Sequence, residues 1–131
     1  MHLSGVAIKV KSMTTSLPKI GAHVDQDDPI GEARAREADL AQFFLGDPQD
    51  WKAPQIRAGV ETLKSAPIDL YVHSPYVINV ATTNNRIRIP SRKIPAQHAD
   101  AAASIGAKAL IVHGGHVLKD DDPATGVDNW R

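Results

Sequence analysis

Cysteine is absent from this 131-residue chain, and no long apolar run occurs in it. Without cysteine the chain can form no disulfide framework, and any metal must be bound by histidine, aspartate or glutamate. No apolar stretch approaches the roughly 18 residues that a membrane-spanning helix needs. The first eleven residues show no clear apolar core or cleavage site of a secretion signal. We therefore expect a bacterial cytoplasmic protein that does not engage a membrane.

Acidic residues are missing from one stretch, residues 70–99, although the whole chain balances 15 cations with 15 acids. Four cations, Arg86, Arg88, Arg92 and Lys93, lie within this stretch. Zero net charge gives the chain no global attraction to nucleic acid, so any attraction must be local. The acid-free segment, interpreted as a basic loop, could neutralise phosphates through Arg86 and Arg88. A merely solvated face is the alternative.

Short apolar runs alternate with helical patterns along the chain, after a weakly patterned extension at residues 1–18. Apolar runs predict strands at residues 20–24, 40–45, 69–72 and 109–112. Asp28 followed by Pro29 predicts the start of a helix that ends near residue 38. A second helix is expected after Pro54, and a third over residues 94–105 with Pro95 in its first turn. The acidic segment Asp120–Asp122 is read as a solvated loop.

Four strands alternating with three helices are typical of a parallel α/β sheet. A doubly wound nucleotide-binding fold usually has a glycine-rich turn after its first strand. Here the first strand leads to Val-Asp-Gln-Asp-Asp-Pro, with no glycine until Gly31. The pattern therefore favours a partial TIM barrel of about four βα units within residues 19–131. A complete barrel needs roughly 250 residues.

Three predicted strands deliver a histidine at or near their carboxyl ends, where α/β folds collect ligands and catalytic groups. His73 and His113 are the best candidates for a shared metal, because neutral imidazole is a common metal ligand. Two histidines cannot complete a zinc site, which needs three or four ligands. Polar strand-end residues bonded to nearby carbonyls are the alternative. His23 and His116 are candidate pocket residues, and His98 is expected at the surface.

Aromatic and polar residues in two loops are candidates for contact with nucleic acid. Tyr76 and Val77 follow His73 and could wedge or stack against an unpaired nucleotide. Gln49 and Trp51 form a similar loop after the second strand. Trp51 is interpreted as a packing anchor, and local packing is also the alternative for Tyr76.

Five segments together resemble the endonuclease IV family, in the style of its actinobacterial members. The match extends from about residue 19 to residue 131. The segments are Ile-Gly-Ala-His-Val at 20–24, Gln-Phe-Phe-Leu-Gly-Asp-Pro-Gln-Asp-Trp-Lys at 42–52, Tyr-Val-His-Ser-Pro-Tyr-Val-Ile-Asn at 71–79, Asn-Asn-Arg-Ile-Arg-Ile-Pro-Ser-Arg-Lys at 84–93 and Ile-Val-His-Gly-Gly-His at 111–116.

This resemblance implies a TIM barrel and a zinc-dependent endonuclease that cuts double-stranded DNA on the 5′ side of abasic sites in base excision repair. It implies that His73 and His113 bind one of three zinc ions. Tyr76 and Val77 correspond to a loop that enters the DNA at the lesion. Gln49 stands where some members have an inserted arginine, which is a departure from the family pattern. Pro95 departs from the usual helix pattern as well.

The resemblance covers only the N-terminal half of the family's barrel, without the later strands that carry further metal ligands. We therefore expect a truncated chain whose exposed half-barrel edge favours self-association. The catalytic residues stay unassigned. Two alternatives remain at this point: a catalytically inactive fragment that needs the C-terminal half, and a related sugar isomerase-like barrel.

Overall fold

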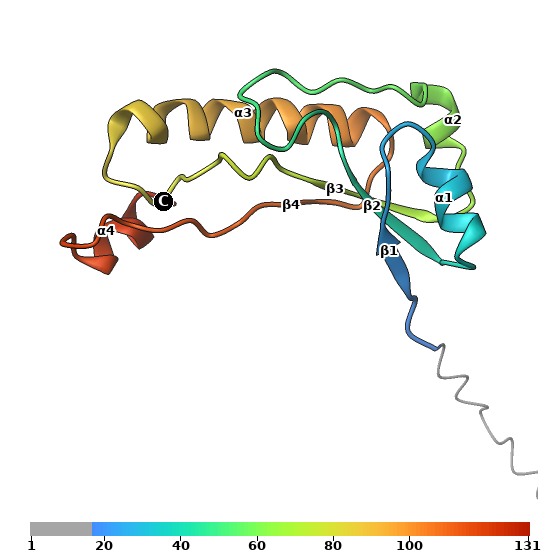
Figure 1. The fold of residues 1–131 in the computed structure, drawn as a ribbon, viewed down its shortest axis with the longest axis horizontal. Coiled ribbons are helices and arrows are strands. Elements are labelled where there is room, and N and C mark those ends of the chain that lie inside the picture. The colour runs from blue at the N-terminus through green and yellow to red at the C-terminus, as the bar shows by residue number, and fades with distance from the viewer. Residues whose placement is uncertain (1–16) are drawn as a thin grey trace, which may run out of the picture.

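The computed structural model describes residues 17–131, so nearly all of the predicted extension at residues 1–18 lies outside it. Strands and helices alternate from the first strand onward (Figure 1). The elements are β1 (Gly21–His23), α1 (Pro29–Ala35), β2 (Leu40–Phe44), α2 (Val60–Lys64), β3 (Asp69–His73), α3 (Asn85–Ser104), β4 (Ala109–Ile111) and α4 (Pro123–Asp128). The four predicted strands are thereby confirmed.

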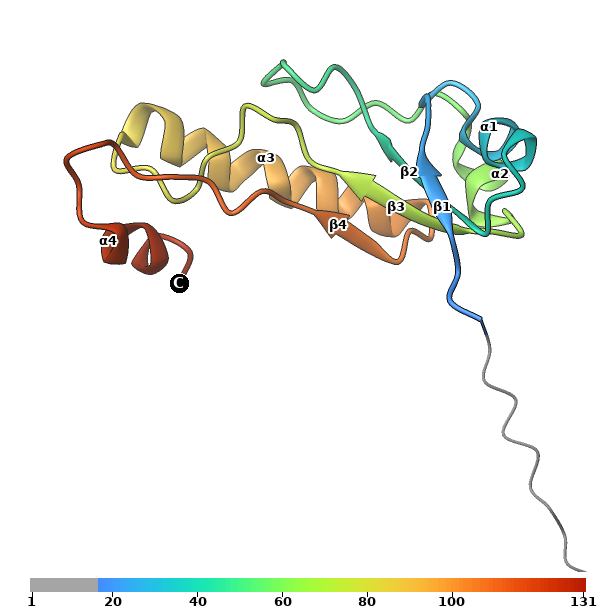
Figure 2. The same ribbon diagram turned by 60° about the horizontal axis from the view of Figure 1, so that its bottom comes forward.

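The strands form one parallel sheet in the order β1-β2-β3-β4. Each strand is hydrogen-bonded to the strand that follows it in the sequence, as in the wall of a barrel. Helices α1, α2 and α3 lie on one side of the sheet (Figures 1 and 2). The predicted parallel α/β architecture, equivalent to part of a TIM barrel, is therefore correct.

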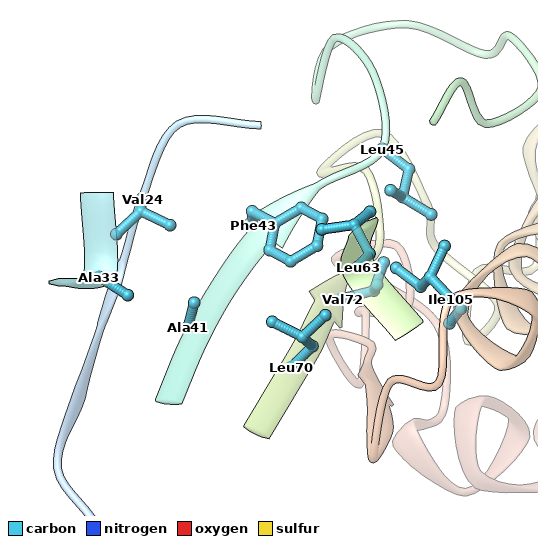
Figure 3. Close-up of a cluster of buried hydrophobic side chains, with 10 residues drawn as sticks. Val24, Ala33, Ala41, Phe43, Leu45, Leu63, Leu70, Val72 and Ile105 are labelled. Carbon is cyan, nitrogen blue, oxygen red and sulfur yellow. The ribbon is translucent and has the colours of Figure 1, made fainter. Parts of the chain in front are cut away.

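The hydrophobic core lies between the sheet and these helices (Figure 3). Side chains alternate along a strand, so Ala41 and Phe43 of β2 and Leu70 and Val72 of β3 point to the same face. All four are at most 3% exposed. Ile105, just after α3, closes the core from the helix side with an exposure of 0%.

Helix α1 begins as its sequence predicts, because the Asp28 side chain accepts a hydrogen bond from the Gly31 N–H and Pro29 occupies the first helical turn. The same Asp-Pro signal recurs at Asp122 and Pro123. There Asp122 caps α4 through the Ala124 N–H at 2.9 Å. The loop predicted around residues 120–123 therefore ends in a helix start.

Helix α2 is shorter than predicted and begins only at Val60. The residues just before Val60 are not helical. The Gln55 N–H donates to the Leu45 carbonyl at 2.8 Å, which joins this segment to the end of β2. Gly59 then turns the chain with φ of 81°. Ile56 still packs on the core, but from outside the helix.

Helix α3 begins nine residues earlier than predicted and continues through both Pro90 and Pro95. The predicted basic loop is therefore wrong, and Arg86 and Arg88 lie on the first turns of a helix. Asn84 caps it by accepting from the Arg86 N–H at 3.0 Å. A proline inside a helix removes a hydrogen bond. Tertiary contacts offset the cost of these lost hydrogen bonds. Ser91 and Ile94, which lie between Pro90 and Pro95 in the sequence, are both buried.

His98 is buried inside the fold with 2% exposure, so its predicted surface position is wrong. It lies on the core-facing side of α3 and borders a cavity of about 130 Å³ beneath the loop that follows β2. Its Nδ1 donates to the Ile94 carbonyl at 3.1 Å, one helical turn back. Burial lowers the pKa of His98 below the ordinary histidine value.

Within the described part of the chain, every helix is too short or too polar to cross a bilayer.

Candidate functional site

Five rings meet at the carboxyl ends of the strands and form what we call the ring cluster, composed of His23, Phe44, His73, Tyr76 and His113. The parallel register explains the convergence. Phe44 pairs with His73, and His73 pairs with Ile111, two residues before His113. Strand ends that are in register bring their side chains to one edge of the sheet. The expectation that three strands deliver histidines to one edge is confirmed.

His73 lies at the centre of the ring cluster and is only 7% exposed. Its ring centroid is 4.9 Å from that of His113, 5.1 Å from Phe44 and 6.2 Å from His23. Its Nδ1 lies 2.6 Å from the Ser74 carbonyl, which can only accept, so Nδ1 carries the proton. In a neutral ring the lone pair is then on Nε2, the form in which histidine binds metals.

The metal-binding capacity of the site is limited to this histidine pair. His73 and His113 are edge to face and close enough to share an ion, and the buried Nδ1 hydrogen bond fixes the ring of His73. In residues 17–131, however, no group of three or more histidine and acidic side chains could hold a metal ion. Two histidines alone fall short of the three or four ligands that a zinc site needs.

His23 occupies the side of the ring cluster next to β1, with its ring 4.7 Å from Phe44. The Gln42 amide donates to its Nδ1 at 2.8 Å, so the proton of the neutral ring is on Nε2. Burial, and secondarily the charge of His73, lowers the pKa of His23. His23 also lines a groove of about 470 Å³ with Phe44, Asp25 and Glu32. His23 thus borders a groove, and because its Nδ1 accepts from Gln42 it offers no third free lone pair.

Phe44 is the member of the ring cluster that sequence reasoning missed. It contacts His23, His73 and Tyr76, the last at 5.2 Å between ring centroids. The signal was present, because Phe44 ends the second strand as His73 ends the third.

Tyr76 packs against both histidines from the loop after β3. Its ring lies 5.4 Å from His73 and 5.5 Å from His113, and the side chain is 47% exposed. The Tyr76 N–H donates to the Pro48 carbonyl at 2.8 Å, which joins this loop to the one carrying Gln49. Val77 is half-buried and packs on a second small core. An exposed aromatic face is thus held directly above the strand ends.

The other predicted contact residues lie around this centre. Gln49 is exposed at a turn where its N–H donates to Asp47 at 2.8 Å. Trp51, predicted to be a packing anchor, is 39% exposed and lies outside both hydrophobic clusters of residues 17–131. His116 has an exposed side chain, and its backbone is bound by Asn79.

The basic residues of α3 differ in their surroundings. Arg86 is exposed on the first turn. Arg88 instead donates to the side chains of Asn129 and Asn85, the latter at 2.6 Å. Arg92 donates to the Asn129 carbonyl at 2.8 Å. The guanidinium groups of Arg88 and Arg92 thus fasten the end of the described chain to α3.

Several known proteins are similar to this chain in sequence. No protein-family profile matches the chain. It is 54% identical over 112 residues to "Probable endonuclease 4" of Mycobacterium ulcerans and of Mycobacterium marinum, and 53% identical to that of Mycobacterium leprae. These matches cover 86% of this chain but 44% of each relative. The chain therefore spans less than half the length of the curated relatives it matches.

A solved structure shares the fold. The crystal structure of endonuclease IV from Thermus thermophilus matches with a TM-score of 0.69, covering 86% of this chain and 45% of that one. At 19% sequence identity this likeness establishes the fold alone. It agrees with the parallel sheet and the helices on one of its faces.

Proposed function

We propose that this chain, which the comparisons identify as an endonuclease IV relative over 112 residues, forms part of an abasic-site endonuclease. The reaction we propose is zinc-dependent hydrolysis of the phosphodiester on the 5′ side of an abasic site in double-stranded DNA, in base excision repair. The observation that carries the proposal is the packing of His73, His113 and Tyr76 into one cluster at the strand ends.

His73 and His113 would supply two ligands to one zinc ion, of the three expected in a complete site. Bound zinc activates water and stabilises negative charge that develops on a phosphate. The described residues contain no third ligand beside the pair, so hydrolysis would require ligands from outside them. On this ground we expect residues 17–131 to be inactive alone, and we assign no catalytic step to any residue here.

The residues around the pair suit a DNA substrate. Tyr76 presents an exposed ring that could stack against an unpaired nucleotide, with Val77 beside it. Gln49 is carried on the loop hydrogen-bonded to Tyr76. Arg86 and Arg88 would contact phosphates, Arg86 directly and Arg88 only if it leaves Asn129. His23 and His116 would border the bound strand.

Two further expectations follow from this proposal. An enzyme that repairs bacterial chromosomal DNA would act in the cytoplasm, associated with the nucleoid. Among the described strands, β1 and β4 are each paired on one side only. Unpaired strand edges favour association, so we expect the isolated chain to self-associate, measurable by light scattering across a concentration series.

The test combines zinc content after dialysis with cleavage of a duplex that contains one abasic site. We expect one weakly held zinc per chain, lost in His73→Ala, and no cleavage. Three tightly held zinc ions with cleavage would support the endonuclease and refute the expected inactivity. Zinc content unchanged in His73→Ala would remove His73 from the site.

DNA binding by the α3 arginines can be measured separately by fluorescence anisotropy. Each lost phosphate contact should reduce the slope of log affinity against log salt by about 0.9. We expect this from Arg86→Ala, and from Arg88→Ala a smaller change together with lower stability. A salt slope unaltered in the double variant would contradict the phosphate role. Binding to intact and abasic duplex with equal affinity would contradict the proposed substrate.

A further inference from the structure

Asn79 joins the two loops that carry Tyr76 and His113 of the ring cluster. It lies in the loop between β3 and α3 and is 8% exposed. The His116 N–H donates to its Oδ1 at 3.1 Å, and its Nδ2 donates to the His116 carbonyl at 3.0 Å. An asparagine amide offers the same donor and acceptor as a peptide group. Asn79 therefore binds His116 as a neighbouring strand would.

We call the two hydrogen bonds between the Asn79 amide and the His116 backbone the clasp. The clasp takes over where the backbone pairing of β3 with β4 stops. The β3–β4 ladder reaches His73 and Ile111, and the last bond in line runs from the Ser74 N–H to the Ile111 carbonyl at 2.8 Å. Beyond it, within the described residues, no backbone hydrogen bond joins these two loops. His113 lies between the end of the ladder and the clasp, so its segment is held on both sides.

Gly115 shows how closely the clasp is fitted. Its φ is 76°, a conformation that favours glycine. A Cβ at this position would lie 2.3 Å from Asn79 Oδ1, far inside contact distance. Two adjacent glycines leave the segment after His113 flexible on their own, so its position must be fixed from outside.

Asn79 is itself fixed before it binds His116. Its Oδ1 also accepts from the Thr82 N–H at 3.1 Å, which orients the amide. Its backbone N–H donates to the buried Ser91 hydroxyl of α3 at 2.9 Å. A side chain anchored by its own loop and by a helix can define where its partner lies.

We propose that Asn79 is a positioning residue that holds the His113 imidazole against His73 and Tyr76. The proposal rests on the proposed function only in giving the histidine pair a metal to bind; the placement of the rings can be measured without metal or DNA. Loss of the clasp should let the segment after Ile111 move while the sheet and its core stay intact.

The matched control is Asn129, a second asparagine that is likewise 8% exposed. Its amide donates to the carbonyls of Ala81 and Thr82, at 3.0 and 3.1 Å, and does not bind His116. Asn79→Ala and Asn129→Ala each strip buried polar partners, so both should lower stability by similar amounts. Asn79→Ala removes the bonds to His116 directly, whereas Asn129→Ala leaves them in place. The neighbour of Asn129, Trp130, also contacts this segment, with its Nε1 donating to the Gly114 carbonyl at 2.7 Å, so the release of His113 should be larger in Asn79→Ala.

The primary experiment is proton NMR of the metal-free chain, with nuclear Overhauser contacts between the His113 ring and the rings of His73 and Tyr76. We expect these contacts to be lost in Asn79→Ala and kept in Asn129→Ala. Contacts kept in a folded Asn79→Ala protein, or lost equally in both variants, would overturn the proposal.

If Asn79→Ala does not fold, Asn79→Asp decides the question, because it keeps acceptors for Thr82 and His116 but replaces the donor to the His116 carbonyl with a charged oxygen that repels it. It should weaken the His113 ring contacts while leaving the His73–Tyr76 contact unchanged. Undiminished His113 contacts in Asn79→Asp would count against the clasp.

Zinc affinity gives a second readout, since residues that orient a metal ligand typically contribute about 10- to 100-fold in affinity. We expect a loss in that range from Asn79→Ala and little change from Asn129→Ala. If the unaltered chain binds no zinc, the proposed function is contradicted, whereas the ring contacts still decide the role of Asn79.

Discussion

Phe43 and Phe44 are adjacent in the sequence, but their side chains point to opposite faces of the sheet. One face packs against the helices, and the other carries the ring cluster. Phe43 points into the helix-covered core and is 1% exposed (Figure 3). Phe44 points to the other face, and its ring packs on His23, His73 and Tyr76. Helices α1, α2 and α3 all lie on the opposite side of the sheet (Figure 2). One face stabilises the fold by exclusion of water, and the other arranges polar rings at its edge.

The largest effect should come from the covered face. Phe43→Ala would remove a fully buried ring and leave a cavity, which costs about 3–5 kcal/mol of unfolding free energy. Chemical denaturation followed by circular dichroism would measure it. If Phe43→Ala lowered the free energy of unfolding by less than Phe44→Ala does, the covered face would not hold the main hydrophobic core.

Phe44→Ala should cost less, about 2 kcal/mol or below, because the ring is only partly buried and its further contribution comes from ring contacts. It should instead disturb the ring cluster, with loss of the NMR contacts between the His23 and His73 rings. If Phe43→Ala and Phe44→Ala destabilised the protein equally, the contrast between the faces would fail.

A smaller effect should appear in the pH dependence of stability. The pKa of His98, on the helix side, is lowered by burial, and that of His23, on the open face, by burial and His73. Each lowered pKa means that the unfolded chain binds more protons, so stability is lost as pH falls below about 6.5. The loss should be larger for His98, which is the more deeply buried of the two.

Denaturation of His98→Gln and His23→Gln at a series of pH values would test this. Replacement of His98 should flatten the decline in stability below pH 6.5 more than replacement of His23 does. A steeper or unchanged decline in His98→Gln would show that the buried histidine is not the group responsible.

The smallest effect should come from an ion pair at the opposite end of the open face. Lys19 Nζ lies 2.6 Å from Asp69, and its hydrogen bond lowers the pKa of that carboxyl. The stability this pair contributes is present above about pH 3.8 and lost as the pH falls. Lys19 is 60% exposed, so Asp69→Asn should change stability only slightly.

The measurement is denaturation of Asp69→Asn and the unaltered chain at low salt and at about 1 M salt, where exposed charges are screened. We expect the small difference to vanish at high salt. A difference that persists would show that Asp69 acts through packing and not through charge.

Local patterns predicted the strands well, because each is a short apolar run with turn signals on both sides. Asp28 with Pro29 also predicted its helix correctly, and the same pair at Asp122 and Pro123 could have been recognised. Prolines misled the prediction of α3. The rule that proline breaks a helix rests on hydrogen bonds within the helix. Helix α3 is held in place by the contacts that its buried residues Ser91 and Ile94 make with the rest of the fold.

The candidate site divides in the same way. His23, His73 and His113 could be identified from the sequence, since each follows an apolar strand and parallel strands end at one edge. Three other features could not be predicted from the sequence: the burial of His98, the exposure of Trp51 and the binding of Asn129 by Arg88. They depend on partners at distant positions, and no local pattern encodes them.

The sequence by itself determined the alternation of strands and helices and the arrival of histidines at one edge of the sheet, because side-chain periodicity and strand order are properties of the chain. Only the tertiary structure decided that the ring centroids of His73 and His113 lie 4.9 Å apart beside Tyr76, and that Asn79 binds the backbone of His116. Such distances arise when separate segments pack, and packing is fixed by the whole set of contacts at once.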